Sequence, residues 1–235
     1  MLLTTFEPPL IEARLIKRYK RFFVDAERPD GSIVTAHCAN TGSMLGLLDD
    51  TFTVWLSPAN DPNRKLQYTL ELVDTGDSMV GVHTGRPNKL VEAAILGGAI
   101  PELPAELPLK REQKYGQNSR IDLLQTAPDG RQTFIEVKNV TLRQGDAALF
   151  PDAVTTRGTK HLHELTEQVA AGHRAVMFYL VQRQDCQYFA PARHIDKDYA
   201  ATLDAALAAG VEAIAYSCKL SPTGIELGQK LEIRC

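Results

Sequence analysis

The sequence has few cysteines, and none of them lies near another. The four are far apart along the chain: Cys38, Cys186, Cys218 and Cys235. Because no C-x-x-C pair occurs, the spacing offers neither a structural zinc site nor a redox-active dithiol. We therefore expect four free thiols in a reducing compartment.

The sequence also has no long apolar run and no low-complexity segment, and its first residues do not show the pattern of a secretory leader. No stretch approaches the roughly 20 apolar residues that span a bilayer. The first residues carry no basic region followed by an apolar core. We expect a soluble, cytoplasmic protein without a membrane partner, and the sequence leaves open whether the chain forms a homo-oligomer.

An excess of positive charge is absent as well. The chain has 26 Lys and Arg against 29 Asp and Glu, which gives a formal net charge of −3 at pH 7. The protein as a whole therefore does not attract polyanions. Any nucleic-acid partner must be held by a local basic patch.

The chain is long enough for two domains, since domains usually have about 100–200 residues. The chain has 235 residues, 44% of them hydrophobic. Residues 10–84 resemble a series of short strands separated by turns such as "RPDGS", without a long helix. We predict a small oligonucleotide-binding (OB)-like β-barrel over residues 1–84.

The pattern changes near Gly85 and favours an α/β domain over residues 85–235. A helix is predicted in "RPNKLVEAAILGG", with Asn88 as its N-cap, followed by two strands joined by the turn "APDGR". The segments "RGTKHLHELTEQVAAG" and "DKDYAATLDAALAAG" are typical of helices, and each precedes an apolar strand. The whole chain is therefore of mixed α+β class, with a mixed sheet in the second domain.

Two neighbouring strands carry charges where a buried sheet would have apolar residues. Glu136 and Lys138 are two residues apart and project from the face that Phe134 shares. Antiparallel pairing across the tight turn can bring Asp122 beside this face. Adjacent carboxylates repel each other, and a cation such as Mg²⁺ or Mn²⁺ relieves the repulsion. We predict Asp122 and Glu136 as metal ligands and Lys138 as the residue that orients an attacking water.

A second interpretation is that these three charges form the solvated side of alternating strands, where most strand charges lie. Phe134 on the same face argues against it, because a plainly solvated face would not carry a large apolar side chain. The two interpretations differ in whether the charged groups converge.

The pattern D-x13-E-V-K resembles the PD-(D/E)-x-K core of the restriction-endonuclease-like superfamily. It begins at Asp122 and ends at Lys138, but Arg and Ile occupy positions 120–121, so the proline of the pattern is missing. The resemblance implies a further catalytic acid on the preceding helix, where Glu92 lies. A solvated helix charge is the alternative for Glu92.

Longer blocks resemble one family more closely. They are spread over residues 14–165 and read "RLIKRYKRFFVDA", "HCANTGSM", "VGVHTGRPNKLVEAAI", "SRIDLL", "FIEVKNVTL" and "FPDAVTTRGTKHLHEL". Together they resemble the sugar fermentation stimulation protein A family. The resemblance implies an OB-type barrel, a nuclease-like domain, DNA as the partner, and a link by name to the regulation of maltose and other sugar use. It leaves catalytic activity open.

A basic strand in the first domain is a candidate DNA contact. Five cations fall within eight residues: Arg14, Lys17, Arg18, Lys20 and Arg21. On a regular strand Arg14, Arg18 and Lys20 share one face, which is enough to neutralise phosphates without reading sequence. The alternative is a solvated edge strand that its charges keep from aggregating.

Three further candidates lie near the start of the helix that follows the E-V-K strand. They are Arg157, Lys160 and His161. A phosphate there would meet both side-chain charge and the helix dipole. For the histidine, a plain surface position is the alternative.

The combined prediction is a protein that binds DNA with little sequence preference and carries a Mg²⁺-dependent phosphodiesterase site. One alternative is a DNA-binding transcriptional regulator that keeps the nuclease fold without turnover. Another is a hydrolase of small phosphorylated metabolites. Metal-dependent DNA cleavage that Asp122→Ala abolishes would favour the phosphodiesterase over the regulator.

Overall fold

Six strands in the first part of the chain form a sheet that closes on itself. The computed structural model describes residues 1–116 and 119–235. The six strands are β2 (Ile11–Tyr19), β3 (Phe23–Glu27), β4 (Ile33–His37), β5 (Thr53–Pro58), β6 (Tyr68–Asp74) and β7 (Met79–Gly81). Their order is β4-β3-β2-β5-β6-β7, and a parallel pairing between β4 and β6 closes the barrel. The predicted OB-type barrel is confirmed.

Alternating burial explains why these segments become barrel strands. On β2, Ala13 and Leu15 point into the barrel while the residues between and beside them remain accessible. Their apolar partners on neighbouring strands include Val24 and Val54. A register shift between Leu15 and Lys17 marks a bulge in β2, and this bulge changes which residues share a face.

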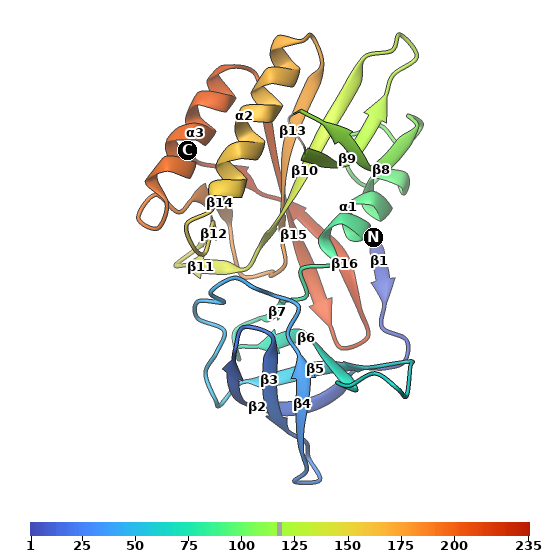
Figure 1. Cartoon of the computed structure of the whole chain (residues 1–235), viewed down its shortest axis with the longest axis vertical. Helices are drawn as coiled ribbons and strands as arrows, with labels where there is room; N and C mark the ends of the chain where they lie inside the picture. Colours follow the sequence, from blue (N-terminus) through green and yellow to red (C-terminus); the bar gives the residue numbers. More distant parts are fainter. Residues whose placement is uncertain (117–118) are drawn as a thin grey trace.

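Seven strands form the sheet of the second domain (Figure 1). In sheet order they are β1 (Leu2–Thr5), β16 (Gly224–Lys230), β15 (Glu212–Ser221), β13 (Arg174–Val181), β10 (Gln132–Val140), β9 (Ser119–Thr126) and β8 (Leu109–Tyr115). The β10, β13 and β15 strands run parallel, whereas the other pairings are antiparallel. The predicted mixed sheet is therefore confirmed.

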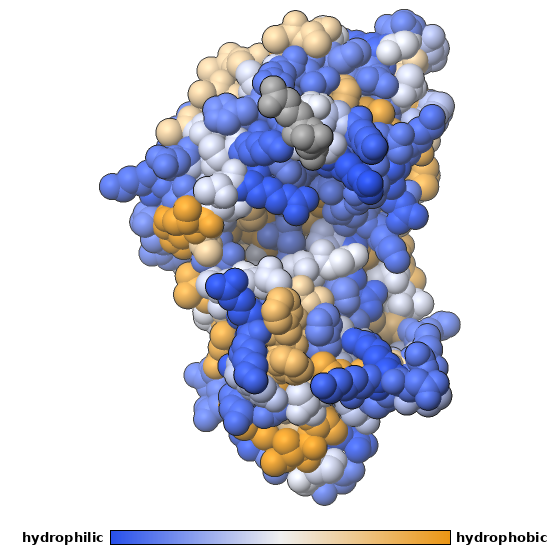
Figure 2. Space-filling model, in the orientation of Figure 1, coloured by the Kyte–Doolittle hydropathy of each residue, from blue (hydrophilic) through white to orange (hydrophobic). Residues whose placement is uncertain are grey.

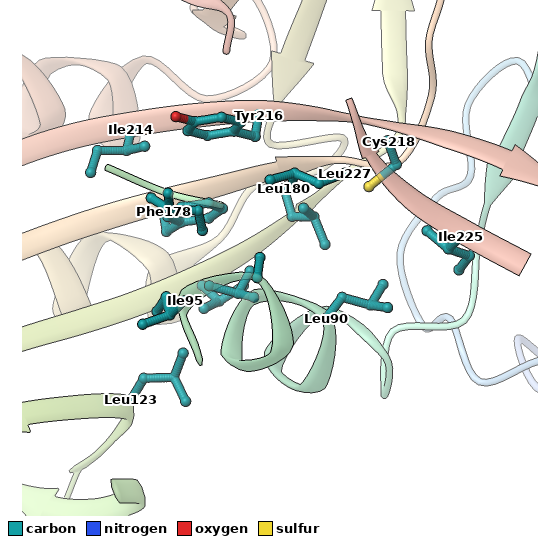
Figure 3. Close-up of a cluster of buried hydrophobic side chains, with 14 of the residues drawn as sticks. Leu90, Ile95, Leu123, Phe178, Leu180, Ile214, Tyr216, Cys218, Ile225 and Leu227 are labelled. Carbon is teal, nitrogen blue, oxygen red and sulfur yellow. The ribbon is translucent and has the colours of Figure 1, made fainter. Parts of the chain in front are cut away.

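Helices cover both faces of this sheet. They are α1 (Pro87–Leu96), α2 (Thr156–Ala170) and α3 (Lys197–Ala208). The α1 helix packs Leu90 and Ile95 against one face, as Figure 3 shows, and α2 and α3 cover the other. The central strand β13 is buried on both faces, which accounts for its continuous apolar sequence.

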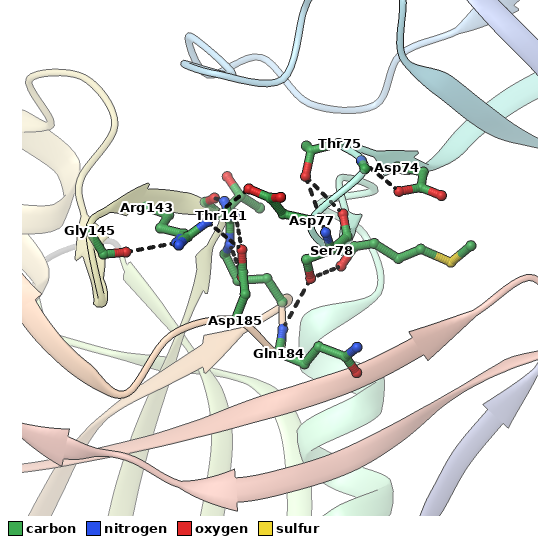
Figure 4. Close-up of polar contacts among 12 residues, drawn as sticks. Asp74, Thr75, Asp77, Ser78, Thr141, Arg143, Gly145, Gln184 and Asp185 are labelled. Carbon is green, nitrogen blue, oxygen red and sulfur yellow. Dashed lines mark hydrogen bonds and ion pairs between the residues drawn. The ribbon is translucent and has the colours of Figure 1, made fainter.

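A small sheet and a polar contact lie near the boundary between the domains. The small sheet consists of β11 (Leu142–Gln144), β12 (Ala147–Phe150), β14 (Tyr188–Pro191) and β17 (Glu232–Ile233). Arg143 makes an ion pair of 3.0 Å with Asp185 and reaches Asp77 of the barrel at 3.5 Å (Figure 4). The backbone N–H of Gly81 donates to the Gln182 carbonyl at 2.9 Å. These contacts join the two domains directly.

The first strand departs from the predicted division of the chain at residue 84. Strand β1 pairs with β16 at the edge of the second sheet, so residues 2–5 belong to that sheet and not to the barrel. The barrel is therefore inserted between β1 and the rest of the second domain.

All four cysteines are free thiols. Among the described residues no helix is both long and apolar enough to cross a membrane.

Candidate functional site

Strands β9 and β10 separate at the point where Asp122 faces β10. The last antiparallel pair of their ladder joins Ile135 to Leu123. At the next position the backbone N–H of Val137 donates to Asp122 Oδ2 at 2.8 Å, so a side-chain oxygen replaces the ladder acceptor. The predicted juxtaposition of Asp122 with the β10 strand is therefore present.

Glu136, Lys138 and His161 form a buried network beside Asp122. Lys138 Nζ donates to Glu136 Oε1 at 2.7 Å. His161 Nδ1 contacts the same oxygen and lies 3.3 Å from Lys138 Nζ. The Glu136 side chain is 3% exposed and that of Lys138 is 12% exposed. These charges are therefore not the solvated side of a strand.

Burial and charge act differently on the two carboxyl groups. Burial raises the pKa of Asp122 to about 6, and the charge of Glu136 acts in the same direction. Burial also disfavours ionised Glu136, but Lys138 and His161 outweigh it and hold the pKa of Glu136 below its ordinary value. Neighbouring carboxyl groups with pKa values pushed apart are typical of acid–base and metal sites.

The donor set suits a hard divalent cation. Glu136 Oε2 is buried and has no hydrogen-bond partner among the residues that the structure describes, whereas Oε1 has contacts from both Lys138 and His161. A buried carboxylate oxygen left in this state is costly unless a cation or a donor meets it. No cluster of three or more His, Cys, Asp or Glu suited to a metal occurs in the described part of the chain. Two carboxylates with water are nevertheless a usual Mg²⁺ site.

The α1 helix contributes Asn88 to the site in place of the predicted Glu92. Asn88 Nδ2 donates to Asp122 Oδ1 at 2.8 Å. Asn88 is not the N-cap, because α1 begins at Pro87 and Arg86 is the capping residue. Glu92 lies one helical turn farther along and pairs with Arg111 of β8 at 3.2 Å. The Glu92 side chain therefore contacts β8, and Asn88 is the residue of α1 that contacts Asp122.

The basic residues of β2 are mostly committed to contacts within the barrel. Arg14 Nη2 pairs with Glu27 at 2.5 Å, and Lys17 Nζ pairs with Asp25 at 3.7 Å. Arg18 donates to the backbone carbonyls of four residues, which are Arg21, Asn40, Gly42 and Ser43. The guanidinium of Arg18 therefore holds the loop over residues 40–43.

The predicted shared face of Arg14, Arg18 and Lys20 is wrong. The bulge in β2 shifts the alternation, and the strand ends at Tyr19. Lys20 and Arg21 lie in the turn that follows, with φ values of 48° and 63°. Both side chains are exposed there. No glycine or proline marks this turn, and the basic residues continue through it, so it could not be predicted from the sequence.

On α2 the three predicted phosphate contacts separate into different roles. His161 is buried within the acidic network, and Arg157 Nε donates to its Nε2 at 3.4 Å. Lys160 Nζ lies 3.6 Å from Glu164 Oε1, one turn along the helix. The alternation along β10 predicted Glu136 and Lys138, and antiparallel pairing across the turn predicted Asp122. The roles of Asn88 and His161 depend on how two helices pack on the sheet.

Two adjoining cavities form a groove between the domains. Their volumes are about 240 and 610 Å³, and they share Thr41, Gly42, Phe150 and Asp152. In Figure 2 the molecule narrows where the two domains meet. Ser43 Oγ donates to the Asp152 carboxylate at 3.0 Å, and Met44 N donates to the same oxygen at 3.0 Å. We call this feature the inter-domain groove.

Comparisons with known proteins agree with this architecture. The SfsA N-terminal OB domain matches residues 16–82, and the sugar fermentation stimulation protein RE domain matches residues 85–224. A sugar fermentation stimulation protein homolog of Paramagnetospirillum magneticum is 55% identical, with 96% of each chain covered. One from Nitrosococcus oceani is 52% identical, with 97% of this chain and 99% of that chain covered.

A solved structure gives the same result for the fold. The structure of Pyrococcus furiosus SfsA in complex with Ca²⁺ aligns with a TM-score of 0.89 and 27% sequence identity, and each chain is covered completely. The resemblance seen in the sequence blocks is thereby confirmed. The chain belongs to the sugar fermentation stimulation protein family.

Proposed function

We propose that the protein binds DNA with little sequence preference and hydrolyses its phosphodiester backbone with the help of a divalent cation. The observation that carries this proposal is the buried position of Asp122 beside Glu136, whose charge acts on it. Lys138 donates to one oxygen of Glu136, and the other oxygen has no partner among the described residues. A purely structural site would pair both oxygens. The proposal therefore explains an otherwise costly arrangement.

Asp122 and Glu136 would hold the cation, with Mg²⁺ or Mn²⁺ as the expected metals. When bound, the metal would stabilise negative charge on the phosphoryl oxygens and lower the pKa of a nearby water. The archaeal relative whose structure is described as a complex with Ca²⁺ supports a divalent cation in this family. Asn88 and the Val137 N–H would keep the Asp122 carboxylate in place.

Lys138 and His161 would then set the geometry of the reaction. An ammonium group has three donors, of which one reaches Glu136 Oε1. His161 Nδ1 acts as a donor to the same oxygen, because Nε2 accepts from Arg157. A remaining N–H of Lys138 would orient the attacking water. His161 would fix the rotamer of Glu136, because both Lys138 and His161 meet Oε1 and leave Oε2 directed elsewhere.

DNA contacts would come from the barrel turn and from the start of α2. Lys20 and Arg21 are exposed, and Arg157 is exposed on the first turn of α2. Contacts of this kind neutralise phosphates and give affinity that depends on salt. They carry no sequence information, which accounts for the low preference we propose.

Cleavage of plasmid and single-stranded DNA in Mg²⁺ or Mn²⁺ tests the proposal. We expect the natural protein to cut at least one substrate, Asp122→Ala to be inactive, and Asp50→Ala, which removes an exposed acid, to stay active. Salt-sensitive DNA binding without cutting by any of the three would contradict hydrolysis and favour the regulator. Failure to bind DNA at all would contradict both.

A further inference from the structure

The inter-domain groove touches both elements that carry the buried network. Thr155, which caps the N-terminus of α2, lines the larger cavity, and Asn139, the neighbour of Lys138 on β10, lines the smaller one. His161 lies on α2 six residues after Thr155, a rise of about 9 Å along the helix. An extended ligand in the groove would therefore lead toward the site.

The two walls of the groove differ in chemistry. The barrel wall is polar and cationic, and its members include Arg21, Thr41 and Ser43. The opposite wall is largely apolar, with Phe150, Pro151, Ala153 and Val154. Val154 is 70% exposed there, more than any other large hydrophobic residue in the described part of the chain. A ligand that is anionic on one side and apolar on the other would satisfy both walls.

The groove cannot widen without breaking direct contacts between the domains. Ser43 Oγ donates to the backbone carbonyl of Asp152 at 2.6 Å, in addition to the contacts with its carboxylate. The chains approach so closely that a Cβ atom on Gly42 would lie 2.8 Å from the Asp152 carboxylate. The larger cavity, of about 610 Å³, is within the range of about 300–1,000 Å³ for pockets that enclose one small molecule. It suits a nucleotide and not the two strands of a duplex.

We propose that the groove binds an unpaired nucleic-acid strand, so that the substrate class is single-stranded or frayed DNA. This inference rests on the function proposed above and narrows it. Phosphates would lie on the wall of Arg21, while bases would lie against Val154 and the exposed part of Phe150. Grooves that join cations to apolar or aromatic surface bind single strands in this way.

Charge within the groove is compatible with a phosphate chain. One oxygen of the Asp152 carboxylate, Oδ2, accepts from both Ser43 and Met44, and these donors partly offset its negative charge. Arg18 is occupied by backbone carbonyls, so it contributes positive potential without a free donor fork. Arg21, by contrast, is the cation on this wall whose side chain is exposed to solvent.

Fluorescence anisotropy with labelled oligonucleotides tests the inference in EDTA, where a metal-dependent site does not turn over. The probes are a single strand, its blunt duplex, and the duplex with a single-stranded overhang. We expect the single strand and the overhang to bind at least about tenfold more tightly than the blunt duplex, a difference of about 1.4 kcal/mol.

Two pairs of variants show whether the groove is responsible. Val154→Asp and Arg21→Glu should each weaken single-strand binding about tenfold. Their matched controls, Ile33→Asp and Lys65→Glu, change residues that are also exposed but do not line the groove, and they should bind within about twofold of the natural protein. Thermal unfolding of all four confirms that each is folded.

The outcomes separate this inference from the proposed function. Blunt duplex bound as tightly as the single strand, with no loss in Val154→Asp, would overturn the groove assignment even where Asp122-dependent cleavage of duplex DNA persists. Preferred binding of the single strand without cleavage would support the groove and contradict hydrolysis. Binding of neither probe would overturn both.

Discussion

Strands β2 and β10 are both nine residues long and both carry charged side chains, but the environments of these charges differ. On β2 the side chains of Arg14 and Lys17 are 52% and 63% exposed, and each pairs with an acid at the surface. On β10 the side chain of Lys138 is 12% exposed and is bonded to a carboxylate that is more deeply buried.

The difference in burial sets the free-energy cost of the charges. Exposed charges remain solvated at little cost, whereas buried charges lose solvation and call for a functional explanation. Exposed ion pairs contribute about 0–1 kcal/mol, so those of β2 are compatible with any function or with none. A buried ion pair is not stabilising by itself, because desolvation offsets the attraction between the charges. Glu136 and Lys138 are therefore the stronger pointer to chemistry, and paired substitutions on the two strands test this difference.

The largest expected contrast is between the two lysines. Lys138→Met should lower metal-dependent DNA cleavage by about 10²–10⁴-fold, because the group that orients the water is lost. Lys17→Met removes an exposed ammonium and should leave the rate within about twofold. Initial rates on one DNA substrate measure both. Equal rates for the two variants would remove the distinction between the strands.

The next contrast lies on α2, between a buried and an exposed histidine. His161 contacts Glu136, whereas His163 is exposed. His161→Ala should weaken Ca²⁺ binding about 10–100-fold, because Glu136 loses the group that fixes its orientation. Titration calorimetry without DNA measures the affinity independently of turnover. His163→Ala is the control, and similar losses in both variants would argue against a positioning role.

Asp122 should limit stability above neutral pH. Its pKa is raised from 3.8 to about 6 in the folded protein, so the folded state binds the proton more tightly than the unfolded chain does. This contribution to stability is complete below pH 3.8 and is lost as the pH rises through 6.

Substitution of Asp122 checks that direction. Metal-free Asp122→Asn should be more stable than the natural protein at pH 8 by roughly 1–3 kcal/mol, with no gain near pH 3.5. Urea unfolding at both pH values measures the free energy. Asp50→Asn, at an exposed position, should show no such pH-dependent gain. A loss of stability in Asp122→Asn at pH 8 would contradict the assigned cause.

The smallest contrast compares two arginines of β2. Arg18→Ala should destabilise the protein by about 1–2 kcal/mol, because the carbonyls of the loop over residues 40–43 lose their donor. Arg14→Ala, at a surface ion pair, should cost about 0.5 kcal/mol or less. Chemical denaturation measures both values. If Arg14→Ala lowers the free energy of unfolding as much as Arg18→Ala does, the contacts of Arg18 with the loop do not stabilise the protein more than a surface ion pair does.

Local patterns predicted much of the fold and the centre of the site. Period-two alternation and the turn near residue 129 placed Asp122 beside Glu136, because register in a hairpin follows from the turn. Helices α2 and α3 and the apolar strands after them were visible from their periodicity. These features depend on residues close together in the chain.

The features that sequence reasoning missed depend on distant contacts. Strand β1 pairs with β16, more than 200 residues away, and nothing in "LLTT" specifies that partner. Asn88 reaches Asp122 only because α1 packs on this face of the sheet. The bulge in β2 shifted its alternation, so counting along a regular strand grouped the wrong cations.

A crystal of the protein soaked in Ca²⁺ tests the central claim most directly. We predict one ion with carboxylate oxygens of Asp122 and Glu136 both at about 2.3–2.6 Å, with Oε2 as the Glu136 ligand and Lys138 still beside Oε1. An ion bound elsewhere, with Asp122 and Glu136 sharing none, would contradict the account.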